Sequence, residues 1–263
     1  MPRKPAKLRL SPTRINTYLT CPMKYRYIYF DKIGKFYLKA TPGLSFGTSL
    51  HNALQNFHAE GAVQTREELQ QSVETAWVSA GYSSIEEEQT FKELGMQIIE
   101  TYHEQAVIRT EQQVFTLFTE KTISVEWDRF ILTGRVDRID QHSDGSLEII
   151  DYKSGRTEVY PEDIQESLAM RIYQLILADL YPGQRVFATI FALRSGESAS
   201  YEMPEDERSE FKFEIQQIGH EILERDFENV TPFRIPACEY CEFISRCERY
   251  WKQNERLDSY SDF

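Results

Sequence analysis

Two short segments near the middle of the chain constrain its fold more than any other feature. In ILTGRVDRID, residues 131–140, and in LEIIDYKSG, residues 147–155, apolar β-forming residues alternate with charged ones at a period of two. This alternation is typical of β-strands with one buried face and one polar face. In the second segment, Asp151 and Lys153 therefore project from the same face, about 6.5 Å apart along the strand.

The connection between the two segments determines how their side chains face each other. The sequence HSDGS, residues 142–146, suits a three-residue hairpin loop with Gly145 in the left-handed conformation of a bulge. The resulting register places Asp137 directly opposite Asp151, with Cβ atoms roughly 4.5–5.5 Å apart. A two-residue Asp-Gly turn would instead set Asp137 opposite Tyr152 and direct the two acids to opposite faces. The register is therefore a test of the site.

Carboxylates as close as those of Asp137 and Asp151 repel each other unless a cation or a proton lies between them. We therefore predict a divalent-metal site with Lys153 beside it. The simpler alternative is an ion pair between Asp151 and Lys153 on one strand face, which would stabilise the sheet by only about 0.2–1 kcal/mol. Glu120 lies within another predicted strand; an outward-facing side chain is its favoured interpretation, and a third acid bordering the site is the alternative.

The remaining segments predict an α/β fold, in which helices enclose a mixed sheet of about five strands. Strands and helices are both recognised from the period of their apolar residues, and helix starts from serine, threonine or proline at the first positions. Helices are expected to begin at Pro12 and Pro22 and to cover residues 47–60, 65–80, 85–112, 161–181 and 204–227, and further strands to cover 114–127, 185–194 and 200–203.

Composition limits the classes of protein that the chain can represent. The 263 residues, 41% hydrophobic and 27% charged, suffice for one large domain or for a core domain with a helical subdomain. No apolar run approaches the roughly 18 residues that a membrane span needs, so no membrane partner is expected. The basic N-terminus lacks the apolar segment of a secretion signal, and a cytoplasmic location is the default expectation. The net charge of −12 argues against a general nucleic-acid coat but allows a local basic groove.

The four cysteines form the second informative pattern. Cys238, Cys241 and Cys247 follow the spacing CxxCx5C, and Cys21 is the distant fourth. Four thiolates suit either a tetrahedral zinc ion or a [4Fe–4S] cluster, and the spacing alone does not separate the two. Either centre would tie the two ends of the chain together. Closing so long a loop would stabilise the fold by roughly 4–5 kcal/mol if the chain-entropy estimate for disulfides carries over.

Taken together, these motifs resemble the PD-(D/E)XK nuclease superfamily. The resemblance rests on GRVDRID, IIDYKSG, an upstream GxxxH from Gly47 to His51, and the four cysteines, and it runs from Ser11 to Cys247. Within the superfamily, the chain is most similar to the RecB-like branch with an iron–sulfur cluster, which includes the AddB nuclease domain and the CRISPR-associated adaptation exonucleases.

The resemblance implies a restriction-endonuclease-like mixed β-sheet core flanked by helices, forming a single compact nuclease unit. Its expected parts are a helical N-terminal region (1–112) that contributes Cys21 and His51, a nuclease core (113–230) and a C-terminal cysteine-cluster tail (231–263).

The resemblance also implies the residues of the reaction centre. A lone helical histidine is usually structural, but in this family a histidine and two acids bind Mg²⁺ or Mn²⁺. The expected ligands are therefore His51, Asp137 and Asp151, with the backbone carbonyl of Tyr152 as a further oxygen. Lys153 completes the catalytic set with Asp137 and Asp151, and would orient or help deprotonate the attacking water or stabilise the charge of the transition state.

Two further residue assignments follow from the family. The cysteine ligands carry over, and the family favours a [4Fe–4S] cluster over zinc; these ligands are Cys21, Cys238, Cys241 and Cys247. Family members often carry QxxxY in the helix after the lysine. Tyr173 matches the tyrosine, but Ala169 stands where glutamine is expected, so the resemblance does not carry over DNA contact by this helix.

The function implied is a metal-dependent DNA exonuclease that hydrolyses phosphodiester bonds, with single-stranded ends as its expected substrate, in DNA repair and recombination or in CRISPR adaptation. Its expected partners are DNA with free ends and a helicase or a CRISPR adaptation complex. Because no GxxxxGK[ST] phosphate loop occurs, unwinding would require such a partner. The alternatives are a DNA-binding module with a vestigial centre and a structural subunit of a nuclease–helicase complex stapled by zinc or an iron–sulfur cluster.

Overall fold

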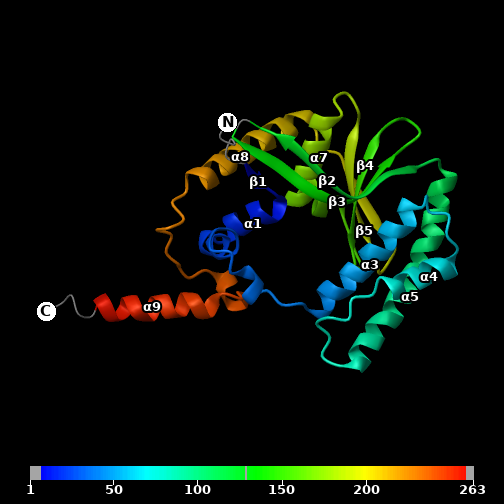
Figure 1. Ribbon diagram of the computed structural model, residues 1–263. Coiled ribbons are helices and arrows are strands. Elements are labelled where there is room, and N and C mark those ends of the chain that lie inside the picture. Colours follow the sequence, from blue (N-terminus) through cyan, green and yellow to red (C-terminus); the bar gives the residue numbers. More distant parts are fainter. Residues whose placement is uncertain (1–6, 128, 259–263) are drawn as a thin grey trace, which may run out of the picture. The chain divides into compact units, whose positions relative to one another are not determined.

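A mixed β-sheet with helices on both sides is the main element of the fold (Figure 1). The computed structural model describes residues 7–127 and 129–258, and in this part of the chain the sheet has six strands. The predicted α/β class is confirmed. The strands are β1 (Leu8–Leu10), β2 (Phe115–Glu126), β3 (Phe130–Gln141), β4 (Leu147–Lys153), β5 (Val186–Ala192) and β6 (Ser198–Tyr201).

The described chain separates into two compact units, each made of segments that are distant in sequence. One unit contains the residues up to Pro12 together with Ala40–Gln216, and the other contains Thr13–Lys39 together with the residues from Gln217 onward. The helical elements are α1 (Pro12–Thr20), α2 (Pro22–Tyr25), η1 (Arg26–Phe30), η2 (Gly34–Phe36), α3 (Pro42–Ala59), α4 (Arg66–Thr75), α5 (Ile85–Glu111), α6 (Pro161–Gln165), α7 (Leu168–Leu180), α8 (Glu205–Glu224), η3 (Pro236–Tyr240) and α9 (Ile244–Asp258). In the described ranges, no helix combines the length and apolarity needed to cross a bilayer.

Several elements differ from the sequence prediction, among them α9 and the end of α4 at Thr75, and three of the differences have a clear local reason. The sheet has a strand more than expected, because β1 is too short to show an alternating pattern. The helix expected from residue 47 already begins at Pro42, where the Thr41 side chain accepts a hydrogen bond from the Leu44 amide. The helix expected over residues 161–181 is divided into α6 and α7, since Ser167 caps a new helix by accepting from the Met170 amide.

The predicted hairpin register is confirmed over the residues where β3 and β4 pair. The pairs run from Arg138 opposite Ile150 to Gln141 opposite Leu147, as the three-residue loop requires. Gly145 adopts a φ of +84°, the left-handed conformation expected of it. Local turn chemistry therefore determined the alignment of the two central strands.

One edge of β3 has a stretch that is not paired with any described strand. β2 occupies the opposite edge, while β1 pairs with Phe130–Leu132 and β4 with Arg138–Gln141. Asp137 lies in the interval between β1 and β4. There the Tyr152 amide donates a 2.8 Å hydrogen bond to Asp137 Oδ2. The carboxylate of Asp137 thus accepts an amide hydrogen bond of β4, as backbone carbonyls of β3 do where the two strands pair.

Helix α3 is held against the sheet by its apolar stripe. Leu50, Ala53, Leu54 and Phe57 are fully buried in a cluster with residues of α4, α5, β4 and β5. Burial of each large side chain contributes about 1.5–3 kcal/mol. His51 follows Leu50 directly, so the packing of this stripe carries the histidine to the opening in the sheet.

Candidate metal centre

Three metal-ligating side chains gather where the sheet opens. One ligand atom from each of His51, Glu120 and Asp137 lies within 4.8 Å of the other two. His51 Nδ1 is 3.4 Å from Asp137 Oδ1 and 3.8 Å from Glu120 Oε1, and His51 Nε2 is 3.1 Å from the Tyr152 carbonyl oxygen. Elements α3, β2 and β3 therefore each supply one group to the same point, while the β4 carbonyl lies at the other ring nitrogen of His51.

Glu120 differs from the interpretation that its strand position favoured. Its side chain is only 11% exposed, and its Oε2 lies 2.6 Å from Arg135 Nε. The backbone of Glu120 has a φ of +45°, within a strand that pairs with β3 on both sides of it. A non-glycine residue in this region costs of order 1–3 kcal/mol and persists only where the surrounding structure imposes it. An alternating sequence pattern carries no signal for such a kink, so the sequence could name a third acid bordering the site only as the alternative interpretation of Glu120.

Asp151 and Lys153 form the same-face pair that the strand pattern predicted. Lys153 Nζ lies 2.5 Å from Asp151 Oδ2, with the carboxylate 14% and the lysine 43% exposed. Burial raises the pKa of Asp151, Lys153 lowers it, and the charge of Asp137 raises it again. In the close-packed group, Glu120 takes the position that the sequence assigned to Asp151. Asp151 is still near enough for its charge to raise the pKa of His51.

A protonated histidine compensates the charge of the carboxylates. Burial disfavours the imidazolium form of His51, but hydrogen bonds to Asp137 and Glu120 outweigh it and raise the pKa of His51 to about 10. The pKa of Tyr173 is also raised, first by burial and then by the charges of Asp151, Asp137 and Glu120. A cation is therefore favoured at this point of the protein.

The residues present fit a divalent metal ion. Carboxylate and carbonyl oxygens with an imidazole are suitable ligands for Mg²⁺ or Mn²⁺. The site opens into a cavity of about 490 Å³, which gives access to a ligand. The cavity is lined by Gly43, Leu44, Gly47, Thr48, His51, Asn52, Glu120, Arg135, Asp137, Tyr152, Lys153 and Ser154.

Two glycines allow close approaches around the centre. A Cβ atom on Gly47 would lie 3.1 Å from Ser154 Oγ, so the GxxxH glycine lets α3 approach the end of β4. A Cβ atom on Gly134 would lie 2.6 Å from Cδ1 of Tyr173, so the ring of Tyr173 packs directly on the β3 backbone. Gly134 thereby places the tyrosine of α7 beside the acidic residues.

The contact at Gly134 leads to a first prediction. Gly134→Ala should lower the free energy of unfolding by about 1–3 kcal/mol, because the added methyl group must displace the Tyr173 ring. Thermal unfolding measures this loss. Gly134→Ala should cost less when it is introduced into a Tyr173→Ala protein than when it is introduced into the wild type. Gly155→Ala is the matched control, since a Cβ atom there meets nothing within 4 Å. Equal melting temperatures for the Gly134 and Gly155 variants would contradict the contact.

The cysteines lie together in the other unit. Cys21 caps α2, accepting from the Lys24 amide at 3.4 Å, and Cys247 is buried on α9. Burial raises the pKa of the Cys247 thiol, the Tyr27 hydroxyl lowers it, and the neighbouring Cys21, Cys241 and Cys238 raise it further. The structure thus brings all four predicted cysteine ligands into one neighbourhood.

The cysteine sulfurs do not form a close-packed group of the kind seen around His51. Among the described residues, no three cysteine sulfurs lie within 4.8 Å of one another.

Sequence reasoning did not identify a buried polar cluster beneath the site. The guanidinium of Arg138 contacts His58, Tyr102 and Tyr152, and its side chain is only 3% exposed. The sequence patterns assign His58 no role. The available signals were an arginine among apolar residues of β3 and a histidine seven residues, about two helical turns, after His51.

Comparison with known proteins assigns the chain to a family. A model of the PD-(D/E)XK nuclease superfamily matches residues 9–248. The chain belongs to the PD-(D/E)XK nuclease superfamily. The superfamily resemblance inferred from the motifs is therefore confirmed.

One curated protein and one solved structure illustrate what this superfamily member is similar to. It is 26% identical over 199 residues to an ATP-dependent helicase/deoxyribonuclease subunit of Clostridium tetani, in a match that covers 64% of this chain and 17% of the relative. The chain thus spans about a sixth of that relative. A crystal structure of an exonuclease candidate from Eubacterium rectale superposes with a TM-score of 0.54 at 12% identity, covering 92% of this chain and 87% of the other. This likeness confirms the nuclease-like fold.

Proposed function

We propose that this nuclease is a metal-dependent DNA exonuclease acting on single-stranded ends, in DNA repair and recombination or in CRISPR adaptation. The observation that carries the proposal is the grouping of His51, Glu120 and Asp137 within 4.8 Å beside the Asp151–Lys153 pair, in a chain of the PD-(D/E)XK superfamily. The deoxyribonuclease in the name of the Clostridium tetani relative supports DNA as substrate, and the helicase in that name supports a helicase as partner.

The proposed ligands of Mg²⁺ or Mn²⁺ are His51, Asp137, Asp151 and the Tyr152 carbonyl, with Glu120 as an accessory acid. A bound ion would polarise the scissile phosphate and lower the pKa of water. Lys153, fixed by its 2.5 Å contact to Asp151 and partly exposed in the cavity, would orient the attacking water or stabilise negative charge on the phosphate.

For the cysteine site we propose a [4Fe–4S] cluster held by Cys21, Cys238, Cys241 and Cys247, with zinc as the alternative occupant. The amide of Lys24 donates to Cys21 Sγ, and such N–H···S bonds influence the potential of iron–sulfur centres. The three-part organisation with boundaries at residues 112 and 230 is likewise a proposal.

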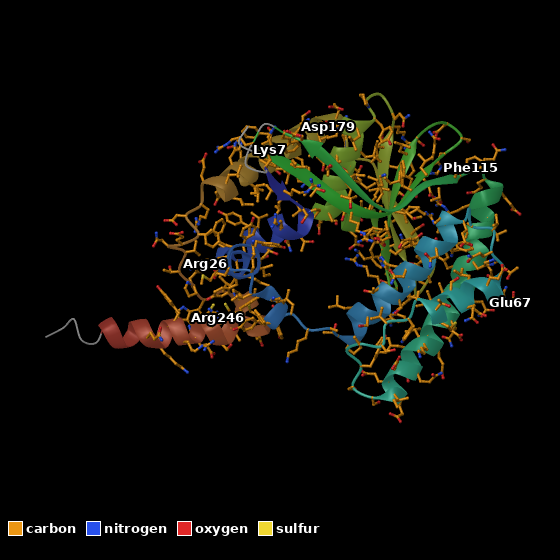
Figure 2. The ribbon with its side chains drawn as sticks, in the orientation of Figure 1. Lys7, Arg26, Glu67, Phe115, Asp179 and Arg246 are labelled. Atoms are coloured by element: carbon orange, nitrogen blue, oxygen red, sulfur yellow. The ribbon has the colours of Figure 1, made fainter. Side chains whose placement is uncertain are left out.

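A basic pocket in the unit of Thr13–Lys39 and the residues from Gln217 supports DNA as the ligand. Residues 13–39 carry six lysines and arginines against a single aspartate, although the whole chain is acidic. Arg26, Arg246 and Arg249 line a pocket of about 410 Å³, and two of them are labelled in Figure 2. Guanidinium groups suit the phosphates of a nucleic-acid backbone.

The direct test is digestion of single- and double-stranded DNA, labelled at either end, with Mg²⁺, Mn²⁺ or EDTA. We expect metal-dependent loss of nucleotides from the ends of single strands. Absence of cleavage on every substrate, in protein that carries its cysteine-bound metal, would exclude the proposal. The short match to a much larger relative makes a non-catalytic subunit of a nuclease–helicase complex the second candidate.

The charge of His51 predicts how metal binding depends on pH. Because the pKa of His51 is raised to about 10 without metal, the ion must displace a proton at neutral pH. Apparent Mn²⁺ affinity should therefore rise about tenfold per pH unit between roughly pH 6 and 9. Calorimetry in buffers of different ionisation enthalpy counts the released proton. A His51→Gln variant should lose this dependence; the same slope in both proteins would exclude His51 as a ligand.

A further inference from the structure

We propose that the buried cluster around Arg138 positions the metal centre through Tyr152, the central residue of the DYK segment. Arg138, Tyr102 and the hydroxyl group of Tyr152 would be positioning groups, with no contact to the reacting atoms. The inference rests on the proposed metal-dependent function and assigns that function a supporting layer inside the core.

The cluster is a closed set of short hydrogen bonds. Arg138 Nη1 lies 2.8 Å from the Tyr152 hydroxyl, 2.6 Å from the Tyr102 hydroxyl and 2.5 Å from His58 Nε2. The two tyrosine hydroxyls are 2.7 Å apart. Because Tyr102 belongs to α5 and His58 to α3, the cluster joins both helices to the central strands.

The cluster combines one buried cation with a neutral histidine. Burial, together with the cations of Arg138 and Arg109, lowers the pKa of His58 well below its usual value, so this imidazole is neutral. Its Nε2 lies within hydrogen-bond distance of both Arg138 Nη1 and the Tyr102 hydroxyl. The carboxylate of Asp140 neutralises Arg138 at 2.9 Å and is itself held by Arg109 at 3.0 Å and by the Thr116 hydroxyl at 2.9 Å. Arg138 is therefore fixed on both sides.

Tyr152 connects this cluster to the metal centre through three groups of one residue. Its hydroxyl is anchored on Arg138, its amide donates to Asp137 Oδ2 at 2.8 Å, and its carbonyl oxygen is 3.1 Å from His51 Nε2. β5 supports the residue on one side, where Tyr152 pairs with Phe191. On the other side β4 has passed the end of its paired register with β3, so the anchored ring supplies support where the ladder does not.

This geometry predicts a specific effect of removing one oxygen atom. Groups that orient metal ligands typically change metal affinity or activity by 10- to 100-fold when they are lost. Tyr152→Phe should therefore weaken Mn²⁺ binding about tenfold and lower kcat, with KM for DNA unchanged. Tyr102→Phe should act in the same direction, and the double variant should lose less than the product of the two single effects, since both tyrosines bind one guanidinium.

Tyr18→Phe is the matched control. Its ring is 3% exposed and its hydroxyl donates to Glu221 at 2.6 Å, so the variant also removes one buried hydroxyl, in the cysteine-containing unit. We expect it to lower the melting temperature about as much as Tyr152→Phe while Mn²⁺ affinity and kcat stay at the wild-type level. If Tyr152→Phe and Tyr102→Phe behave like this control, the cluster only stabilises the fold and the inference is wrong.

Two measurements separate failure of this inference from failure of the proposed function. Mn²⁺ affinity is measured on the full chain without DNA, and cleavage is measured on the wild-type protein. Wild-type protein that binds Mn²⁺ and cleaves DNA, beside unaffected tyrosine variants, overturns the positioning role alone. Wild-type protein that neither binds Mn²⁺ nor cleaves DNA overturns the proposed function and the inference that rests on it.

Discussion

Asp151→Asn should reduce the kcat for phosphodiester cleavage by about 10³-fold, and Lys153→Met by a similar factor, within the range typical of lost acid–base or electrostatic groups. The amide keeps the shape of the carboxylate but loses the charge that attracts a divalent cation. The methionine keeps the stem of the lysine but removes the ammonium beside the cavity. Both rates are measured on end-labelled single strands at saturating Mg²⁺.

The melting temperatures of these variants should not fall in step with their cleavage rates. Burial and Asp137 raise the pKa of Asp151, which means that the folded protein disfavours its charged form in the absence of metal. A neutral isostere should therefore leave the metal-free melting temperature unchanged or increase it, as is common for residues retained for function. A large loss of melting temperature would point to a structural ion pair instead.

A second ion pair in the same unit supplies the control. Lys212 Nζ lies 2.8 Å from Asp179 Oδ2, and both side chains are partly exposed. Asp179→Asn and Lys212→Met repeat the same chemical changes in a pair that lines no described part of the metal centre. Their cleavage rates should match the wild type. Undiminished Mg²⁺-dependent degradation in both the Asp151 and the Lys153 variants would refute the catalytic assignment.

Cys241→Ser should remove the metal proposed for the cysteine site and destabilise the protein strongly. If the site contributes roughly 4–5 kcal/mol by tying the chain ends together, the melting temperature should fall by about 8–20 °C, at about 2–4 °C per kcal/mol for a chain near this size. Thermal unfolding and metal analysis of anaerobically purified protein measure the two effects together.

The control and the identity of the metal come from the same experiment. Ser245 lies between Cys241 and Cys247 in the sequence, and its side chain is exposed. Ser245→Ala should therefore leave both the metal content and the melting temperature unchanged. A brown colour with bound iron and sulfide in the wild-type protein, but not in Cys241→Ser, would support the cluster. Colourless wild-type protein with one zinc per chain would assign the site to zinc. A wild-type protein that contains no metal and is no more stable than Cys241→Ser would contradict a metal staple.

The parts that the sequence predicted are those set by local rules. Gly145 and its flanking residues fix the hairpin register because a three-residue turn leaves few alternatives. The apolar stripe of α3 follows from helical periodicity and positions His51 without further information. The superfamily motifs then connect His51, Asp137 and Asp151, although residue spacing alone would not have related a helix at residue 51 to a strand at residue 137.

The parts that escaped prediction depend on tertiary structure. Glu120 turns inward through a positive φ that only its surroundings can impose. Arg138 resembles any alternating charge of β3 until α3 and α5 supply His58 and Tyr102 to bury it. β1 gains its strand conformation from pairing with β3, since three residues carry no periodic signal of their own.

The discontinuous composition of the cysteine-containing unit has a consequence for biosynthesis. Cys21 leaves the ribosome 217 residues before Cys238, a delay of about 10–40 s at translation rates of 5–20 residues per second. The unit that holds the metal centre is complete once Gln216 has emerged, whereas the other unit still lacks its second segment. The sheet can therefore form during translation, before Cys238, Cys241 and Cys247 of the proposed cysteine site have been synthesised.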